Sequence, residues 1–295
     1  MNKNEPDVGT SRRGFIIKSV QWCGTTFLLP SIHNISLAMN KQNQSKDDIS
    51  LAQWALVDEL RGGKWKNLDF PRIAREDFGL NGIEFVNTLF EVPTVSYLNQ
   101  LKQNAAQHGV NMILIMVDSE GDGAEPTAEL RKQFVINHKK WVDIAHYLGC
   151  HVIRTNCRGP KNADTTEALK WATESYNMLL EYAQTADMKI VIENHGGVSN
   201  NDDWMVQLMK KVDNPNFGTY PDWRQPSDDF DNYEYLKKTL PWALGMSYRN
   251  QPTEELTAKM IKMSKESGYK GWYGIESSGR DAIHQGIGLL KKYLL

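Results

Sequence analysis

Short apolar runs alternate with longer amphipathic stretches along the chain from residue 49 onward. The runs have the length of buried strands, and the stretches carry apolar residues at helical spacing. This alternation predicts strands at 50–55, 82–86, 112–117, 151–156, 189–194, 217–220, 244–248 and 272–276. It predicts helices near 67–78, 94–108, 126–148, 164–187, 201–212, 230–239, 253–267 and 280–293. Several of these helices end at a glycine suited to a left-handed cap, namely Gly79, Gly109, Gly149 and Gly268.

The number of strand–helix units predicts the fold. Eight units within roughly 250 residues are typical of a closed parallel barrel. The competing fold is an open doubly wound sheet, which requires a glycine-rich phosphate turn after the first strand. Residues 56–63 read LVDELRGG there and lack that pattern. We therefore predict a single (β/α)8 TIM barrel, in the α/β class, over residues 49–295.

Residues 1–38 have the pattern of an export signal. Residues 11–18 read SRRGFIIK, and a weakly apolar segment at 19–35 leads to the small-x-small sequence SLA at 36–38. This pattern resembles a twin-arginine (Tat) signal peptide, although a chance match in a basic N-terminus is the alternative. The resemblance implies export by the Tat machinery and a periplasmic localisation. Residues 39–48 read MNKQNQSKDD, and their polar composition predicts a short linker.

Composition and charge exclude some classes of function. Lys and Arg number 34 and Asp and Glu number 36, which gives a net charge of -2. Nucleic-acid binders are usually basic, so no nucleic acid is expected as a partner. No apolar run reaches the length of about 18 residues that a membrane span needs, so no stable membrane association is expected. The sequence leaves the oligomeric state open.

Acidic residues follow three of the predicted strands, at the barrel end where catalytic residues gather. Glu193 follows three β-branched residues, Glu276 follows an apolar run, and Asp222 follows the sixth strand. Burying an unpaired carboxylate is costly, so each should face a cation, a donor cluster or a metal. The alternatives are a structural salt bridge to Arg154 or Lys189 for the glutamates, and a turn cap for Asp222.

Other polar and aromatic side chains near the strand ends are candidates for binding a sugar. Arg154 and Asn156 share one face of the fourth strand and could hold sugar hydroxyls or a carboxylate. The aromatic residues could stack on a sugar ring, although packing between barrel and helices is the alternative for most of them. The predicted substrate-binding set is Gln53, Trp54, Glu84, Arg154, Asn156, Trp223 and Tyr248.

Five short motifs lie at the predicted strands. They are LAQW at 51–54, GIE at 82–84, IENHGG at 192–197, Phe217-Gly218 followed by Asp222, and GWYGIE at 271–276. Each motif is short, so their specificity comes from their order and spacing. Together they resemble the xylose-isomerase-like superfamily of sugar isomerases and epimerases, which also contains type-2 apurinic endonucleases. The likeness covers about residues 49–293.

The resemblance implies one divalent metal ion (Mn, Mg, Co or Zn) held by a Glu, an Asp, a His and a Glu from strands five to eight. The matching ligands here are Glu193, Asp222 and Glu276. The strand-seven histidine is replaced by Ser247, and a second family histidine falls on Gln225. A water molecule or His195 could complete the ligand set; loss of the metal is the alternative.

We interpret the chain as a metal-dependent sugar isomerase or epimerase, or a keto-glycoside lyase. A metal bound to neighbouring sugar oxygens acidifies the adjacent C–H group. Glu193, Glu276 or His195 would then act as the catalytic acid or base. His195 lies two residues after Glu193 and should face the same side, although it could instead only orient that carboxylate.

Two other functions are weighed against this one. The first is a metal-free glycoside hydrolase that uses Glu193 and Glu276, and the second is a sugar-binding barrel without catalysis. An apurinic endonuclease is disfavoured by the negative charge and the few histidines. Export, and the absence of a phosphate-binding motif, favour neutral sugars or keto-glycosides over sugar phosphates.

Overall fold

The computed structural model describes residues 49–227 and 229–294. The predicted signal peptide at 1–38 and the linker at 39–48 lie outside the described residues. The candidate site lies within the described part of the chain, which forms the barrel.

Eight parallel strands form the sheet, in the order β6-β5-β4-β3-β2-β1-β8-β7. The strands are β1 (Ile49–Ala52), β2 (Gly82–Val86), β3 (Asn111–Met116), β4 (Val152–Thr155), β5 (Lys189–Glu193), β6 (Phe217–Tyr220), β7 (Met246–Tyr248) and β8 (Tyr273–Ile275). Strands β6 and β7 meet through single parallel bridges, Thr219 to Ala243 and Asp222 to Ser247, which nearly close the ring. The predicted (β/α)8 TIM barrel is confirmed.

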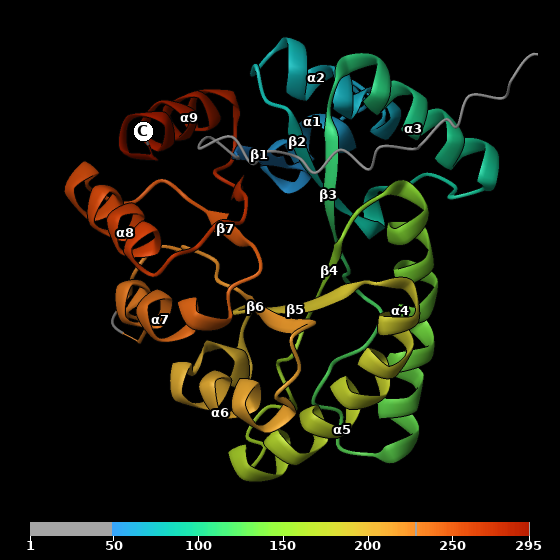
Figure 1. Cartoon of the computed structure of the whole chain (residues 1–295), viewed down its shortest axis with the longest axis vertical. Helices are drawn as coiled ribbons and strands as arrows, with labels where there is room; N and C mark the ends of the chain where they lie inside the picture. Colours follow the sequence, from blue (N-terminus) through green and yellow to red (C-terminus); the bar gives the residue numbers. More distant parts are fainter. Residues whose placement is uncertain (1–48, 228, 295) are drawn as a thin grey trace, which may run out of the picture. The chain divides into compact units, whose positions relative to one another are not determined.

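Helices surround the strands, as Figure 1 shows. They are α1 (Val57–Arg61), α2 (Phe70–Glu76), α3 (Val95–His108), α4 (Ala128–Leu148), α5 (Thr165–Ala183), α6 (Asp202–Val212), α7 (Asn232–Thr239), α8 (Glu254–Glu266) and α9 (Arg280–Leu294). Helices α3 and α4 end as predicted, because Gly109 and Gly149 take φ values of 62° and 88° that suit glycine. None of the helices in the described residues is long and apolar enough to cross a membrane.

Short 3-10 helices occupy several connections. They are η1 (Gln53–Leu56), η2 (Asn67–Asp69), η3 (Asn87–Leu89), η4 (Gln184–Ala186), η5 (Gly197–Asn200) and η6 (Leu240–Trp242). The first strand was predicted to reach residue 55, but it ends at Ala52 because the chain turns directly into η1. Helix α1 lies in a segment for which no element was predicted.

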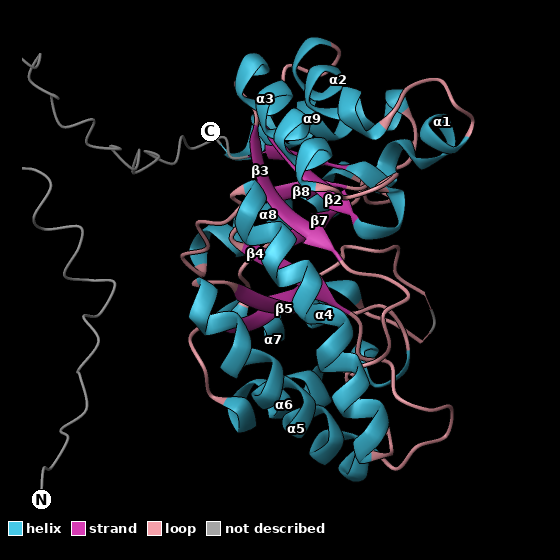
Figure 2. Cartoon of the chain, turned by 90° about the vertical axis from the view of Figure 1, so that its right-hand side faces the viewer, coloured by secondary structure: helices cyan, strands magenta, loops and turns pink. Residues whose placement is uncertain are grey.

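Alternation along the strands sorts the apolar side chains into two layers. One cluster fills the barrel interior and includes Val191, while the other packs between strands and helices and includes Ile190 and Ile192. Successive strand residues face opposite sides, so Glu193 shares the inward face of Val191. Figure 2 views the barrel from the side, with long loops beyond the ends to which the strand arrows point. The inward residues at this end form the site.

Candidate active site

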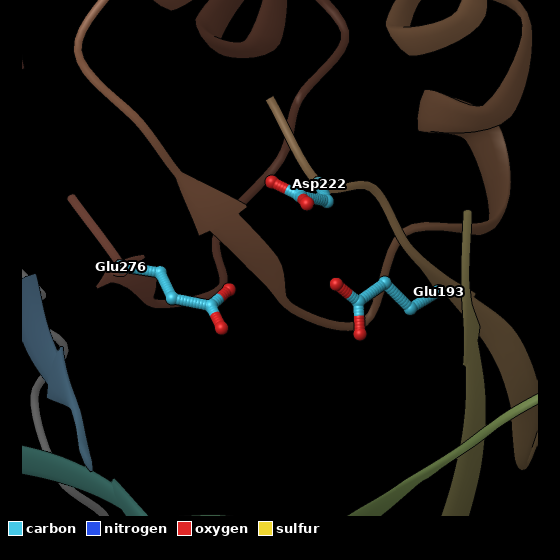
Figure 3. Close-up of side chains that lie close together, drawn as sticks. All are labelled: Glu193, Asp222 and Glu276. Atoms are coloured by element: carbon cyan, nitrogen blue, oxygen red, sulfur yellow. The ribbon is translucent and has the colours of Figure 1, made fainter. Parts of the chain in front are cut away.

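Three carboxylates converge at the C-terminal ends of the strands. Glu193 is the last residue of β5, Asp222 lies two residues beyond β6, and Glu276 directly follows β8. One oxygen of each lies within 4.8 Å of the others, and all three residues are buried. Figure 3 shows the carboxylate groups pointing toward one another. We call these three residues the acidic triad.

Two arginines neutralise part of the triad's charge. The Nε atom of Arg154 lies 2.8 Å from Glu193 Oε2, and its Nη1 donates to Asp118 Oδ1 at 2.7 Å. The Nε atom of Arg249 donates to Asp222 Oδ1 at 2.7 Å, and its Nη2 lies 3.2 Å from Glu276 Oε2. Each triad member therefore has a guanidinium partner.

The environment separates the pKa values of the triad. Burial raises the pKa of Glu276 to about 8, and repulsion from Glu193 adds to the rise, which Arg249 offsets only in part. Burial likewise raises the pKa of Asp222 to about 6 against the opposing effect of Arg249. Burial also opposes ionisation of Glu193, but the charge of Arg154, the contact with His195 and the charge of Arg249 together outweigh burial and lower that pKa. Glu193 is therefore the triad member that most readily stays ionised, and Glu276 is the one that most readily keeps a proton.

The triad opens into a cleft with two connected parts. The inner cavity has a volume of about 80 Å³ and is lined by the triad and both arginines. The outer cavity has a volume of about 480 Å³. Trp54, Asp118 and His195 line both parts. The cleft thus places the acidic triad at the bottom of a larger space, where a ligand of sugar size can enter.

The chemistry of the inner cavity fits a divalent cation. Four carboxylates and two guanidinium groups line it, which leaves a formal charge of -2. One divalent cation would balance that charge. An all-oxygen carboxylate set is also what Mg²⁺, Mn²⁺ and similar hard cations prefer. Glu193, Asp222 and Glu276 could hold such an ion.

Several of the predicted site residues do line the cleft. Trp54 and Arg154 line the inner cavity beside the triad, and Asn156 lines the outer one. The side chain of His195 is 42% exposed, and its Nδ1 lies 3.4 Å from Glu193 Oε2. His195 is therefore placed both to contact a ligand and to orient the Glu193 carboxylate.

Other predicted substrate-binding residues lie away from both cavities. Trp223 and Tyr248 are buried and pack on each other with ring centroids 5.3 Å apart. By the alternation of side chains along β6 and β7, both residues face outward toward the helices. They belong to the cluster between strands and helices, so neither side chain points into the cleft. Gln53 is buried as well, and its Oε1 accepts a hydrogen bond from the backbone of Val86. These placements favour packing and structural roles for the three residues.

Glu84 lies inside the barrel and lines neither cavity. It accepts a hydrogen bond from Ser50 Oγ at 2.6 Å and another from the Tyr220 hydroxyl. Burial raises the pKa of Glu84 to about 7. Its carboxylate oxygens would also lie only 2.6 Å from a Cβ built on Gly274. Glu84 therefore fills the interior next to β8 rather than contacting a ligand in the cleft.

Sequence reasoning assigned no role to the second arginine or to the outer acidic residues. Arg249 stands two residues after Ser247 and so shares its inward face, which is the signal that could have revealed it. Asp118 follows β3 with the same inward parity as Met116. The outer residues Asp122, Glu125 and Arg158 come from loops, where no periodicity marks them.

A comparison with protein families identifies the family to which the chain belongs. The profile of the xylose isomerase-like TIM barrel family matches residues 73–293. The chain belongs to the xylose isomerase-like TIM barrel family. This confirms the superfamily resemblance found in the sequence. A comparison with curated protein sequences found no significant match.

Solved structures share the fold of this family member at low sequence identity. A D-tagatose 3-epimerase-like protein matches with a TM-score of 0.68 and 16% identity, over 84% of this chain and 97% of that chain. D-psicose 3-epimerase from Clostridium cellulolyticum H10 matches with a TM-score of 0.64 and 14% identity, over 82% of this chain and 89% of that chain. The 3-keto-D-glucoside 4-epimerase from E. coli matches with a TM-score of 0.66 and 12% identity, over 83% of this chain and 99% of that chain. At these identities the likeness establishes the fold.

Proposed function

We propose that this protein is a metal-dependent sugar isomerase or epimerase that removes a proton beside the carbonyl of a keto-sugar. Cleavage of a keto-glycoside by elimination begins with the same proton removal and belongs to the same proposal. The observation that carries it is the buried acidic triad at the bottom of the cleft. The family and the epimerases that share the fold support this reading.

The triad would hold the divalent cation, and a bound cation would polarise a substrate oxygen and acidify the neighbouring C–H group. The residues of the chain would move the proton. In the metal-free protein Glu193 has a lowered pKa and is ionised, so it is available to accept the proton, whereas Glu276 has a raised pKa and is the group more ready to hold one. His195 borders both cavities and would orient Glu193 or relay the proton.

The charge of the cleft indicates the class of substrate. Asp118, Asp122 and Glu125 line the outer cavity, where Arg158 supplies the opposing charge. A phosphate group would be repelled by these carboxylates. We therefore propose a neutral keto-sugar or keto-glycoside rather than a sugar phosphate. The outer cavity lies within the range of about 300–1,000 Å³ typical of small-molecule sites, so it has room for a second sugar ring.

Export is the second part of the proposal. The twin-arginine-like sequence at 11–18 supports transport by the Tat machinery to the periplasm. Tat substrates are folded before export, so a metal could be loaded in the cytoplasm. A periplasmic location also agrees with a substrate that carries no phosphate.

A glycoside hydrolase is the second candidate, because Glu193 and Glu276 have the divergent pKa values of an acid–base pair. The geometry disfavours an inverting hydrolase. One oxygen of Glu193 and one of Glu276 lie within 4.8 Å of each other, whereas the carboxyl groups of inverting hydrolases lie about 6.5–9.5 Å apart to admit the attacking water. A retaining hydrolase, with carboxyl groups about 5–5.5 Å apart, is the form of this candidate that the geometry allows.

Proton exchange in D₂O tests the proposed function directly. The purified chain is incubated with keto-hexoses and 3-keto-glycosides in D₂O, with Mn²⁺ or with chelator, and followed by NMR. We expect deuterium at the carbon beside the carbonyl only with Mn²⁺, and no exchange with Glu193→Gln. Glu254→Gln, at an exposed carboxylate on α8, is the matched control and should exchange normally. Release of free sugar without exchange, and without the unsaturated keto-sugar that elimination leaves behind, would instead identify a hydrolase.

A further inference from the structure

The guanidinium group of Arg249 lies against two of the three proposed metal ligands. Its Nε donates to Asp222 Oδ1 at 2.7 Å, and its Nη2 lies 3.2 Å from Glu276 Oε2. Its Nη1 donates to the backbone oxygen of Glu276 at 3.1 Å. Arg249 therefore already provides, from within the chain, positive charge that a bound cation would also provide.

The two arginines of the inner cavity are held in different ways. Arg154 belongs to β4, its side chain is 2% exposed, and it spans Glu193 and Asp118. Arg249 follows the end of β7, and its side chain is 27% exposed. A long side chain at a strand end can turn toward solvent without unburying a strand. Arg154 is thus fixed, whereas Arg249 is placed to move.

The residue that replaces the family histidine contacts the same two carboxylates. Ser247 Oγ donates to Glu276 Oε2 and lies 3.4 Å from Asp222 Oδ1. Arg249 stands two residues later on the same inward face. The chain therefore directs a hydroxyl and a guanidinium at these oxygens, and the guanidinium, unlike the family histidine, has no lone pair to offer a metal.

We propose that Arg249 and the divalent cation compete for Asp222 and Glu276. In the metal-free protein, Arg249 is the counter-ion of the triad, and it must withdraw when the cation binds. The physical reason is that two cations in one buried cavity repel strongly, and that both draw on the same oxygens. The proposal rests on the metal site of the proposed function and deepens it, because it makes the cation weakly held and exchangeable.

Titration of the full chain with MnCl₂ in a calorimeter, at constant ionic strength, tests the competition. We expect Arg249→Gln to bind Mn²⁺ about tenfold more tightly than wild type, or better, a gain of ~1.4 kcal/mol. Arg249→Lys keeps the charge and should stay within about threefold of wild type, because a cation still opposes the metal. Arg249→Met removes the charge at similar length and gives the answer if the Gln variant does not fold.

Arg72→Gln is the matched control. Arg72 lies on α2, its side chain is 43% exposed, and it pairs with Glu76. Its loss should change Mn²⁺ affinity by less than about threefold, because an exposed charge outside the cleft is screened. Equal or weaker Mn²⁺ binding by folded Arg249→Gln would overturn the competition and leave the metal site intact. Failure of wild type and variants to bind Mn²⁺ would overturn both proposals.

Discussion

At the residue scale, the proposed function rests on how three buried carboxylates share two arginines. Arg154 holds Glu193 ionised, while Asp222 and Glu276 share Arg249 and keep raised pKa values. The two triad carboxylates whose ionisation is least favourable therefore lie beside Arg249. A cation bound there would relieve both the repulsion and the cost of burial.

The raised pKa of Glu276 predicts a pH dependence of stability in the presence of a chelator. The folded protein holds this proton up to a pH of about 8, whereas the unfolded chain loses it near the ordinary value of 4.5. The folded state thus binds more protons between these values, and the stability falls as the pH rises. From pH 6 to 8, wild type should lose on the order of 2 kcal/mol that Glu276→Gln does not lose.

Urea unfolding in EDTA at pH 6, 7 and 8 measures this difference. Glu276→Gln can still accept the hydrogen bond of Ser247 through its amide oxygen, so it mimics the protonated acid. Titrating groups far from Glu276 are common to both proteins and cancel in the comparison. Parallel stability curves for the two proteins would show that Glu276 titrates normally.

At the element scale, the weakest junction of the barrel lies between β6 and β7. Only isolated bridges join them, and one of these joins Asp222 to Ser247. Gly218 in β6 makes the close approach possible, because a Cβ there would lie 2.4 Å from the Trp242 carbonyl oxygen and 2.6 Å from Leu244 Cγ. The geometry of the site therefore depends on a residue that does not touch it.

We expect Gly218→Ala to separate the two strands. The overlap should cost about 1–3 kcal/mol of folding free energy, and Mn²⁺ affinity should fall because Asp222 shifts relative to Ser247. Gly288→Ala is the control: it lies within α9 with no atom within 4 Å of its Cβ, and should gain roughly 0.5–1 kcal/mol. Chemical unfolding and Mn²⁺ titration of both variants test this, and a Gly218→Ala protein as stable as wild type would contradict it.

Strand alternation explains how much of the site could be predicted from the sequence. The eight strands and the barrel followed from hydrophobic periodicity, and the three carboxylates followed from their positions at strand ends. Residue type alone makes Trp223 and Tyr248 candidates for binding a sugar. Their side chains face outward from the barrel, so they lie under the helices instead. The partners of Arg249 could not be predicted, because they depend on how far neighbouring strands extend in three dimensions.

At the scale of the whole molecule, the cleft and the N-terminal sequence point to the same kind of substrate. The outer cavity carries three carboxylates, which disfavours phosphate. The sequence at 11–18 carries the paired arginines of the proposed export signal. An enzyme acting outside the cytoplasm on unphosphorylated sugars accounts for both features.

Replacement of both Arg12 and Arg13 by Lys tests the export. The charge is unchanged, so a merely basic N-terminus would behave as before, whereas the Tat pathway requires the arginine pair. We expect the wild-type chain in the periplasmic fraction of a Tat-competent host, and the double variant in the cytoplasm. Equal export of the two chains would contradict the Tat signal.

The metal content of the protein tests the central claim most directly. The purified full chain is dialysed to equilibrium against millimolar MnCl₂, beside Asp222→Asn and the surface control Glu254→Gln, and bound metal is measured by elemental analysis. The acidic triad predicts about one Mn²⁺ per chain in wild type and in Glu254→Gln, and a large loss in Asp222→Asn. A wild-type chain that takes up no Mn²⁺, Mg²⁺, Co²⁺ or Zn²⁺ would show that the triad is not a metal site.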